Sequence, residues 1–269
     1  MKTQFDPFYI EYDNITSPAV DFKTECISAA KKATADTILP LVVMMSGGID
    51  SELVAESLRL ANIPFNAVIC RLISKDITVN NHDFQYAERW CKKHSVEIIY
   101  CDIDIDKQSN LLCQYALSAS GFSPQYACHM YIMKWCSDKG FFFLAGNGEM
   151  DFIFRDNQYY MLDEQREFTL GNFCRLHNLT GVWQFWKQDA RLAAAFLQLP
   201  TVKQLMKEKV LRILDYKHKC FADIFEFEAR IKQTGFEEIQ EWDYILRNTM
   251  KNVNGKFDDK YYTPLLKFQ

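Results

Sequence analysis

A six-residue turn, Ser-Gly-Gly-Ile-Asp-Ser at residues 46–51, constrains this chain more than any other feature. An apolar run at residues 39–45 precedes it, and residues 52–60 have the pattern of a helix. A strand, a glycine turn and a helix start form a cradle for an anion. Glycine lets the backbone approach closely, and the first helical amides point at the ligand. Asp50 is an acid in this anion site, which a metal bridging its carboxylate to phosphate oxygens would explain.

Apolar runs that alternate with helical patterns predict the fold. Strands are expected at 39–45, 64–70, 96–101 and 141–145, and helices at 22–37, 52–60, from Asn81, at 110–117 and at 126–136. This alternation predicts βαβ units, and hence an α/β fold with a doubly wound, mostly parallel sheet. Ligands of such sheets bind at the carboxyl ends of the strands. Two glycine loops, at Gly47 and Gly146, follow strand ends, so we expect them to face one pocket.

The pattern changes near residue 155. A hairpin is expected from residues 159–162 and 166–170, joined across 163–165. Residues 183–248 are expected to be mostly helical. We therefore predict a domain at residues 1–155, which contains both glycine loops, and a smaller, mostly helical part at residues 156–269.

Composition excludes several classes of function. The chain has 269 residues and a net charge of −4, so no overall positive charge favours nucleic acid as a partner. No apolar run reaches the length of a membrane span, and the N-terminus lacks the apolar segment of a signal peptide. The 9 cysteines are scattered without a Cys-x-x-Cys pair. This predicts reduced thiols in a cytoplasmic protein, and no zinc site.

The turn at residues 46–51 resembles the signature of the PP-loop ATP pyrophosphatases, which cleave ATP between the α and β phosphates and transfer AMP. It differs from a Walker A loop, which needs Gly-x-x-x-x-Gly-Lys-Ser/Thr. The resemblance implies an adenine nucleotide alpha hydrolase-like, Rossmann-like fold that binds ATP. It implies that residues 1–155 are the ATP-binding domain and that residues 156–269 cover the substrate and the phosphates. The implied phosphate contacts are Ser46, Gly47, Gly48, Ile49, Asp50 and Ser51. The implied adenine contacts, through backbone atoms, are Met45, Ile69 and Cys70.

A second loop, at residues 146–151, resembles the Gly-Glu-Gly-x-Asp-Glu motif of the asparagine-synthetase-like branch of this family. In that branch the loop lies near the adenosine and its acids bind Mg²⁺. Here Asn147 stands in place of the first acid and Met150 in place of the aspartate. The nucleotide contacts that the resemblance implies are Gly146, Asn147 and Gly148. The predicted Mg²⁺ ligands are Asp50, Glu149 and Asp151.

Displacing pyrophosphate develops negative charge on the phosphates, so cations are needed near them. In the asparagine-synthetase-like branch, a lysine from the C-terminal part reaches the phosphates. The candidates for this catalytic role are Lys217, Lys219, Arg230 and Lys232. Arg71, just past the second strand, is a further candidate at the pocket rim. His129 is expected to be a partly buried, hydrogen-bonded histidine and not a catalytic base.

The chain lacks a glutaminase signature, since Lys2 stands where glutamine-dependent asparagine synthetases have a catalytic cysteine. We therefore predict an AMP-forming synthetase that adenylates a small-molecule or nucleobase substrate and releases pyrophosphate. It would pass the activated group to an amine or to ammonia, free or supplied by a partner. Two alternatives stay open. One is an enzyme that inserts sulfur or nitrogen into a nucleobase or tRNA, and the other is a nucleotide-binding module without turnover. Each is compatible with an oligomer.

Overall fold

A computed structural model describes residues 15, 18–119, 124–148, 150–164, 169–222, 224–228, 230 and 260–265. Its central sheet has parallel strands β1 (Leu41–Met44), β2 (Asn66–Ser74), β4 (Ile98–Asp104), β5 (Phe142–Ala145) and β8 (Gly181–Val182). β1 lies between β2 and β5, β4 pairs with β2, and β8 pairs with β5. A short strand, β3 (Ile77–Thr78), pairs antiparallel with the end of β2. The chain order reverses between β1 and β5, which is where ligands of such sheets bind.

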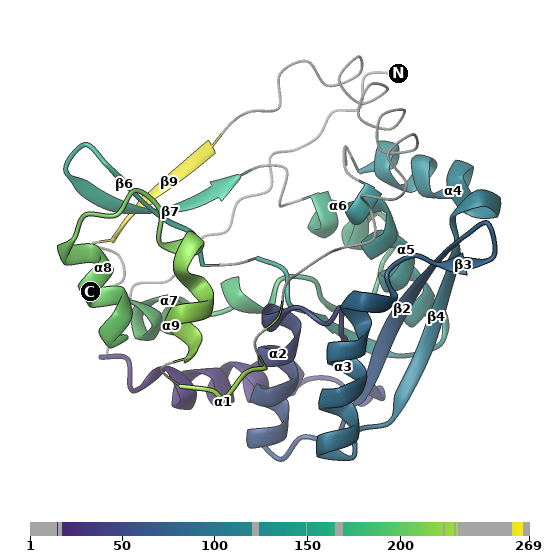
Figure 1. Cartoon of the computed structure of the whole chain (residues 1–269), viewed down its shortest axis with the longest axis horizontal. Coiled ribbons are helices and arrows are strands. Elements are labelled where there is room, and N and C mark those ends of the chain that lie inside the picture. Colours follow the sequence, from purple (N-terminus) through teal and green to yellow (C-terminus); the bar gives the residue numbers. More distant parts are fainter. Residues whose placement is uncertain are drawn as a thin grey trace.

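Helices cover both faces of this sheet (Figure 1). One apolar cluster contains buried residues of α1 (Phe22–Thr34), α2 (Ile49–Leu60) and α3 (Asn81–His94). The other contains those of α4 (Ile105–Ser118), α5 (Pro124–Asp138) and α6 (Thr169–Leu176). Successive strand residues contribute to opposite clusters, as with Val43 in the first and Val42 in the second. The expected doubly wound, mostly parallel fold is therefore confirmed.

The chain after β5 adds a small antiparallel sheet and short helices. The sheet contains β6 (Phe152–Arg155), β7 (Gln158–Glu164) and β9 (Lys260–Pro264). The helices are α7 (Ala190–Leu197), α8 (Pro200–Lys207), α9 (Lys217–Ala222) and two 3₁₀ turns, η2 (Phe185–Lys187) and η3 (Ile213–Tyr216). Their apolar residues join the cluster that contains α1 and α2. The helical prediction for 231–248 lies outside the described residues.

The hairpin prediction was wrong in its position. The turn lies at Asp156 and Asn157, which have φ of 50° and 63°, and the hairpin joins β6 to β7. Two consecutive residues with positive φ suit the right-handed twist of a two-residue hairpin, and Asp and Asn tolerate that conformation. The segment expected to form the turn includes Asp163 and Glu164, which instead belong to β7. Thr169 begins a helix where the second strand was expected to end.

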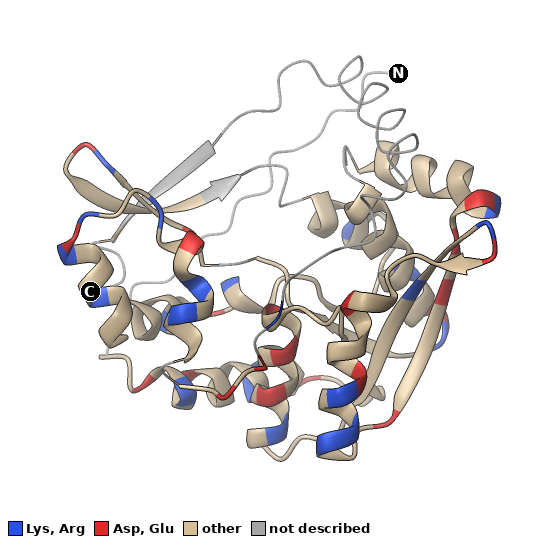
Figure 2. Cartoon of the chain, in the orientation of Figure 1, with Lys and Arg blue, Asp and Glu red and all other residues tan. Residues whose placement is uncertain are grey.

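Charge is dispersed over the surface. Figure 2 shows acidic and basic residues interspersed along the described helices, which agrees with the small net charge of −4. Among the described residues, no helix combines the length and apolar character needed to cross a membrane.

Candidate functional site

The turn after β1 has the strand, glycine turn and helix geometry that its sequence predicts. Gly47 has φ of +83°, and a Cβ there would lie 2.0 Å from the carbonyl oxygen of Asp83. Only glycine fits this position. The Ser51 hydroxyl accepts a bond from the Ser46 N–H at 3.2 Å and donates to the Gly48 carbonyl at 2.9 Å. This side chain therefore ties the first turn of α2 to the end of β1.

The second glycine loop lies against the first. A Cβ on Gly146 would lie 2.8 Å from the backbone nitrogen of Ser51 and 2.9 Å from the carbonyl carbon of Asp50. Gly148 has φ of +84°, and a Cβ there would collide with Gln184. Since both loops follow neighbouring strands, β1 and β5, they meet at one edge of the sheet. The expectation that the two loops face one pocket is confirmed by the residues that line it.

That pocket has a volume of about 320 Å³, within the range typical of small-molecule sites. Its wall is formed by the two loops, β2, the start of α3 and one face of α5. The lining residues are Met44, Met45, Ser46, Asp50, Ser51, Val68, Cys70, Leu72, Asn80, Asp83, Gln125, Tyr126, Cys128, His129, Ile132, Gly146, Asn147 and Gly148. Of the predicted nucleotide contacts, Ile49 and Ile69 do not line the pocket, and their side chains are buried in the core on the α2 side. Gly47 and Gly48 lie within the first loop but do not line the pocket.

Asn80 shapes the β2 wall of the pocket. Its side-chain nitrogen donates to the Cys70 carbonyl at 2.9 Å, and its side-chain oxygen accepts from the Leu72 N–H at 2.8 Å. The pairing of β2 with β1 ends at Val68. Beyond that residue, the Asn80 side chain makes the hydrogen bonds to the β2 backbone that a neighbouring strand would make. Asn80 precedes α3, so the helix start expected at Asn81 is confirmed. The sequence did not reveal this role, because the partners of Asn80 lie eight and ten residues away on another element.

The α5 wall supplies polar groups that the sequence did not assign to the site. Nδ1 of His129 lies 3.1 Å from Nδ2 of Asn147, and both residues line the pocket. The amide nitrogen is a donor, so in this arrangement Nδ1 accepts the hydrogen bond. His129 is hydrogen-bonded and half-buried, as expected. It is also a pocket residue, together with Gln125 and Tyr126 one turn earlier.

Lys217 is the lysine of the C-terminal part that reaches the first loop. Its Nζ lies 2.7 Å from Oδ2 of Asp50, and both side chains are largely buried. Phe221, four residues later on α9, is buried in the apolar core. Residues four apart share one helix face, so Lys217 lies on the inward face. Lys219 lies two positions away on the helix and is exposed. Neither lysine lines the pocket itself, but Lys217 contacts Asp50, which does.

Only part of the predicted Mg²⁺ site is present among the described residues. Asp50 lies in the pocket, but Asp151 is 2% exposed and bound by Arg212, whose Nε lies 2.9 Å from Oδ1. Asp151 does not line the pocket, so its assignment as a ligand was wrong. Glu149 lies outside the described residues. Within the described part of the chain, no three His, Cys, Asp or Glu side chains form a metal cage. Asp50 fits the usual Mg²⁺ arrangement of one or two carboxylates completed by substrate phosphates.

Arg71, the basic candidate expected at the pocket rim, does not line the pocket. Arg71 forms a bidentate ion pair with Asp102, at 2.6 and 2.7 Å, and its guanidinium lies 4.4 Å from the ring centroid of Tyr100. Side chains alternate along a strand, so Arg71 lies on the opposite face of β2 from Cys70 and Leu72. Its assignment to the pocket rim was therefore wrong. Lys232 lies outside the described residues.

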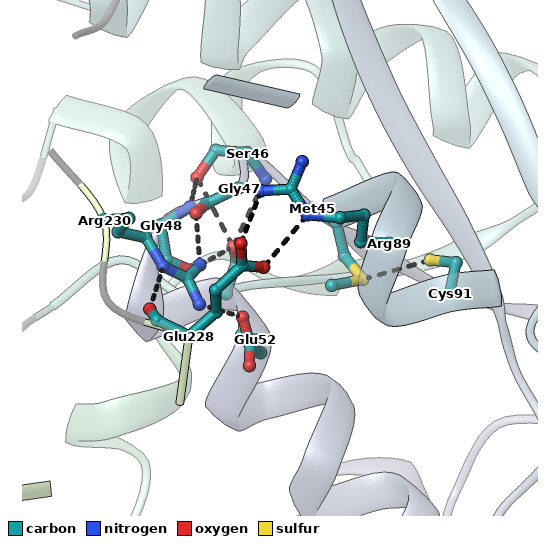
Figure 3. Close-up of polar contacts among 10 residues, drawn as sticks. Met45, Ser46, Gly47, Gly48, Glu52, Arg89, Cys91, Glu228 and Arg230 are labelled. Carbon is teal, nitrogen blue, oxygen red and sulfur yellow. Dashed lines mark hydrogen bonds and ion pairs between the residues drawn. The ribbon is translucent and has the colours of Figure 1, made fainter. Parts of the chain in front are cut away.

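Arg230 contacts the backbone of the first loop on the side that faces away from the pocket. One guanidinium nitrogen, Nη1, donates to the Gly47 carbonyl at 2.5 Å, and the other, Nη2, donates to Oε2 of Glu52 at 2.6 Å (Figure 3). The side chain is 4% exposed and does not line the pocket. Arg230 is thus bound to the loop backbone and to α2, and not placed in the cavity.

Two cysteines, Cys70 and Cys128, line the pocket. Burial raises the pKa of both thiols well above the ordinary value of 9.0. Both are therefore protonated at neutral pH, and the thiolate is the nucleophilic form. Neither has the environment of an activated cysteine.

Comparison with known proteins finds no matching family model and no matching curated protein. The solved structures that align with most of the chain include the following three. An NH3-dependent NAD synthetase from Campylobacter jejuni has a TM-score of 0.35 and 14% identity, covering 88% of this chain and 96% of its own. A U34-tRNA thiolase from Methanococcus maripaludis has a TM-score of 0.39 and 9% identity, covering 88% of this chain and 81% of its own. An NMN synthetase from Francisella tularensis has a TM-score of 0.36 and 12% identity, covering 86% of this chain and 94% of its own. Scores of this size do not establish common ancestry or activity, so the residues of the pocket carry the functional argument.

Proposed function

We propose that this protein is an AMP-forming, ATP-dependent synthetase of the PP-loop class. It would adenylate a small-molecule or nucleobase substrate, release pyrophosphate and pass the activated group to an amine or to ammonia. The observation that carries the proposal is the turn at residues 46–51, held between β1 and α2 where the strand order reverses and opening on the pocket. The first-turn amides of α2 and the helix dipole favour an anion at this position.

The charged residues of the pocket suit phosphate chemistry. Asp50 would hold Mg²⁺ together with phosphate oxygens, and the ion would neutralise charge on the leaving pyrophosphate. Lys217 provides a cation within hydrogen-bond distance of Asp50, beside the loop that would bind the phosphates. A fixed positive charge at this point stabilises the charge that develops as the bond between the α and β phosphates breaks.

The acceptor side of the pocket is the α5 wall. Gln125, Tyr126 and His129 give it polar groups, and Ile132 gives it an apolar surface. A mixed wall of this kind orients a small ligand through a few hydrogen bonds. We place the substrate that is adenylated against this wall, opposite the loop of residues 46–51. We further propose that a partner protein supplies the ammonia. We also propose that the protein is cytoplasmic and that it forms an oligomer.

The alternatives have less support from the pocket. Sulfur insertion by a cysteine of this chain would need a thiolate, and the two pocket thiols have raised pKa values. The second alternative, a nucleotide-binding module without turnover, has more support than sulfur insertion. In the second glycine loop Asn147 replaces an acid, and Asp151 is paired with Arg212, so the loop has fewer carboxylates for Mg²⁺. The experiment below separates that module from an enzyme.

The test is release of labelled pyrophosphate from ATP in the presence of Mg²⁺ and a panel of carboxylate and nucleobase substrates. We expect substrate-dependent release that falls at least a hundredfold in Lys217→Met, whereas the exposed neighbour Lys219→Met keeps wild-type activity. If the protein binds ATP but releases no pyrophosphate with any substrate of the panel, a nucleotide-binding module without turnover is favoured. Production of ADP and phosphate alone would refute the proposed reaction.

A further inference from the structure

The backbone of the first loop is held from outside the pocket by a residue far away in the sequence. Arg230 follows a segment, residues 224–228, that lies along the outer side of α2 and α3 and lines a cleft with them. Its guanidinium bonds both to the Gly47 carbonyl and to the Glu52 carboxylate, and Nε donates to the Glu228 carbonyl at 3.1 Å. Figure 3 shows these bonds meeting at the start of α2.

The bond to Gly47 fixes the direction of one peptide group. A trans peptide is planar, so the C=O of Gly47 and the N–H of Gly48 point in opposite directions. Arg230 binds the carbonyl on the outer side, and the Gly48 N–H is directed toward Ser46, whose Oγ lies 3.3 Å away. Ser46 lines the pocket. Glycine rotates its peptide units easily, so this orientation needs an external restraint.

The pairing with Glu52 keeps Arg230 in place. Glu52 belongs to the first turn of α2 and is 5% exposed. Burial raises the pKa of this carboxyl group above its ordinary value of 4.5, and the hydrogen bond from Arg230 offsets only part of that rise. A buried carboxylate without a cation is strongly disfavoured, so Glu52 retains the guanidinium beside the loop.

Arg89 offers a comparison within the same cluster. Its guanidinium lies 4.6 Å from the centroid of the Tyr86 ring, and that of Arg230 lies 4.8 Å from it. Arg89 also bonds to Glu228, through the carboxylate at 2.8 and 3.0 Å. Within the described part of the chain, Arg89 makes no hydrogen bond to the loop backbone, and its side chain is 48% exposed. The two arginines therefore share their neighbours and differ in the contact with Gly47.

We propose that Arg230 is a positioning residue for the phosphate-binding loop, which holds the peptide between Gly47 and Gly48 with its carbonyl turned outward and its N–H bonded to Ser46, a residue of the pocket wall. The C-terminal segment would thus set the geometry of the anion cradle without touching the ligand. The inference rests on the proposed function for the identity of that ligand, and on the Gly47 contact alone for the positioning.

Hydrogen exchange of the nucleotide-free protein tests the positioning directly. In Arg230→Ala we expect amides of residues 46–52 to exchange about tenfold faster, because a charge-assisted bond to the loop is lost. Arg89→Ala should leave that segment unchanged. Glu52→Gln should accelerate it less than Arg230→Ala does, because the Gly47 bond remains. Equal exchange in Arg230→Ala and wild type would overturn the inference, as would an equal effect of Glu52→Gln.

A second measurement uses steady-state kinetics of pyrophosphate release. Arg230→Ala should raise KM for ATP about tenfold, and added guanidinium at millimolar concentration should lower this KM part of the way back. Arg89→Ala should leave KM for ATP unchanged, with or without guanidinium. Arg230→Lys covers the case in which the alanine variant does not fold, and it should show an intermediate KM. If wild type releases no pyrophosphate while the exchange effect is present, the proposed reaction fails and the positioning stands. If wild type is active and the variant matches it in exchange and KM, the positioning fails and the reaction stands.

Discussion

Replacement of Gly47 by alanine gives a quantitative test of the site geometry. The backbone there has φ of +83°, and placing an L-residue in this conformation costs roughly 1–2 kcal/mol. The new Cβ would also lie 2.0 Å from the Asp83 carbonyl oxygen, so the start of α3 would have to move. Overpacking of this kind costs roughly 1–3 kcal/mol. We expect Gly47→Ala to lower the free energy of unfolding by about 2–5 kcal/mol in total.

Gly140 provides the matched control. Its φ is +77°, nearly the same, but a Cβ there has nothing within 4 Å. Gly140→Ala should therefore cost only the conformational term, roughly 1–2 kcal/mol. Urea unfolding of both variants measures the difference, and ATP binding by calorimetry should be lost only in Gly47→Ala. Equal destabilisation of the two variants, or normal ATP binding by Gly47→Ala, would refute the packing of the loop against α3.

Two further predictions concern ion pairs between distant elements. Lys217→Met and Asp50→Asn should each destabilise the nucleotide-free protein by about 1–3 kcal/mol in urea unfolding, and the double variant should lose less than the sum; additive losses would show that the pair contributes nothing. The hydrogen bond from Arg191 lowers the pKa of Glu25 below its ordinary value of 4.5, so this stabilisation is complete above pH 4.5 and disappears as the pH falls through the lowered pKa. Melting curves between pH 3 and 7 should therefore show Glu25→Gln less stable than wild type near neutral pH and converging with it in acid, and a constant difference would contradict the assignment.

The displaced hairpin illustrates a limit of reading strands from local pattern. Apolar and aromatic residues are frequent on both sides of Asp156-Asn157 and again on both sides of residues 163–165. Pattern alone does not choose between the two turns. The choice follows from burial, because Phe152 and Met161 are both completely buried and pair across the hairpin. A shift of the turn would move those side chains out of the core.

The sequence by itself determined the local units of this protein: the strand, glycine turn and helix at residues 39–60, the alternation of strands and helices, and the positions of both glycine loops. These depend on residues a few positions apart, and so the signal is present in any short window. The tertiary structure alone decided which distant side chains complete the site. Four basic residues were equal candidates in the sequence, and packing of Phe221 turns Lys217 inward, 167 residues from its partner Asp50. Contacts between distant segments also place Arg230 against Gly47 and pair Asp151 with Arg212, because burial and charge pairing are properties of the assembled fold.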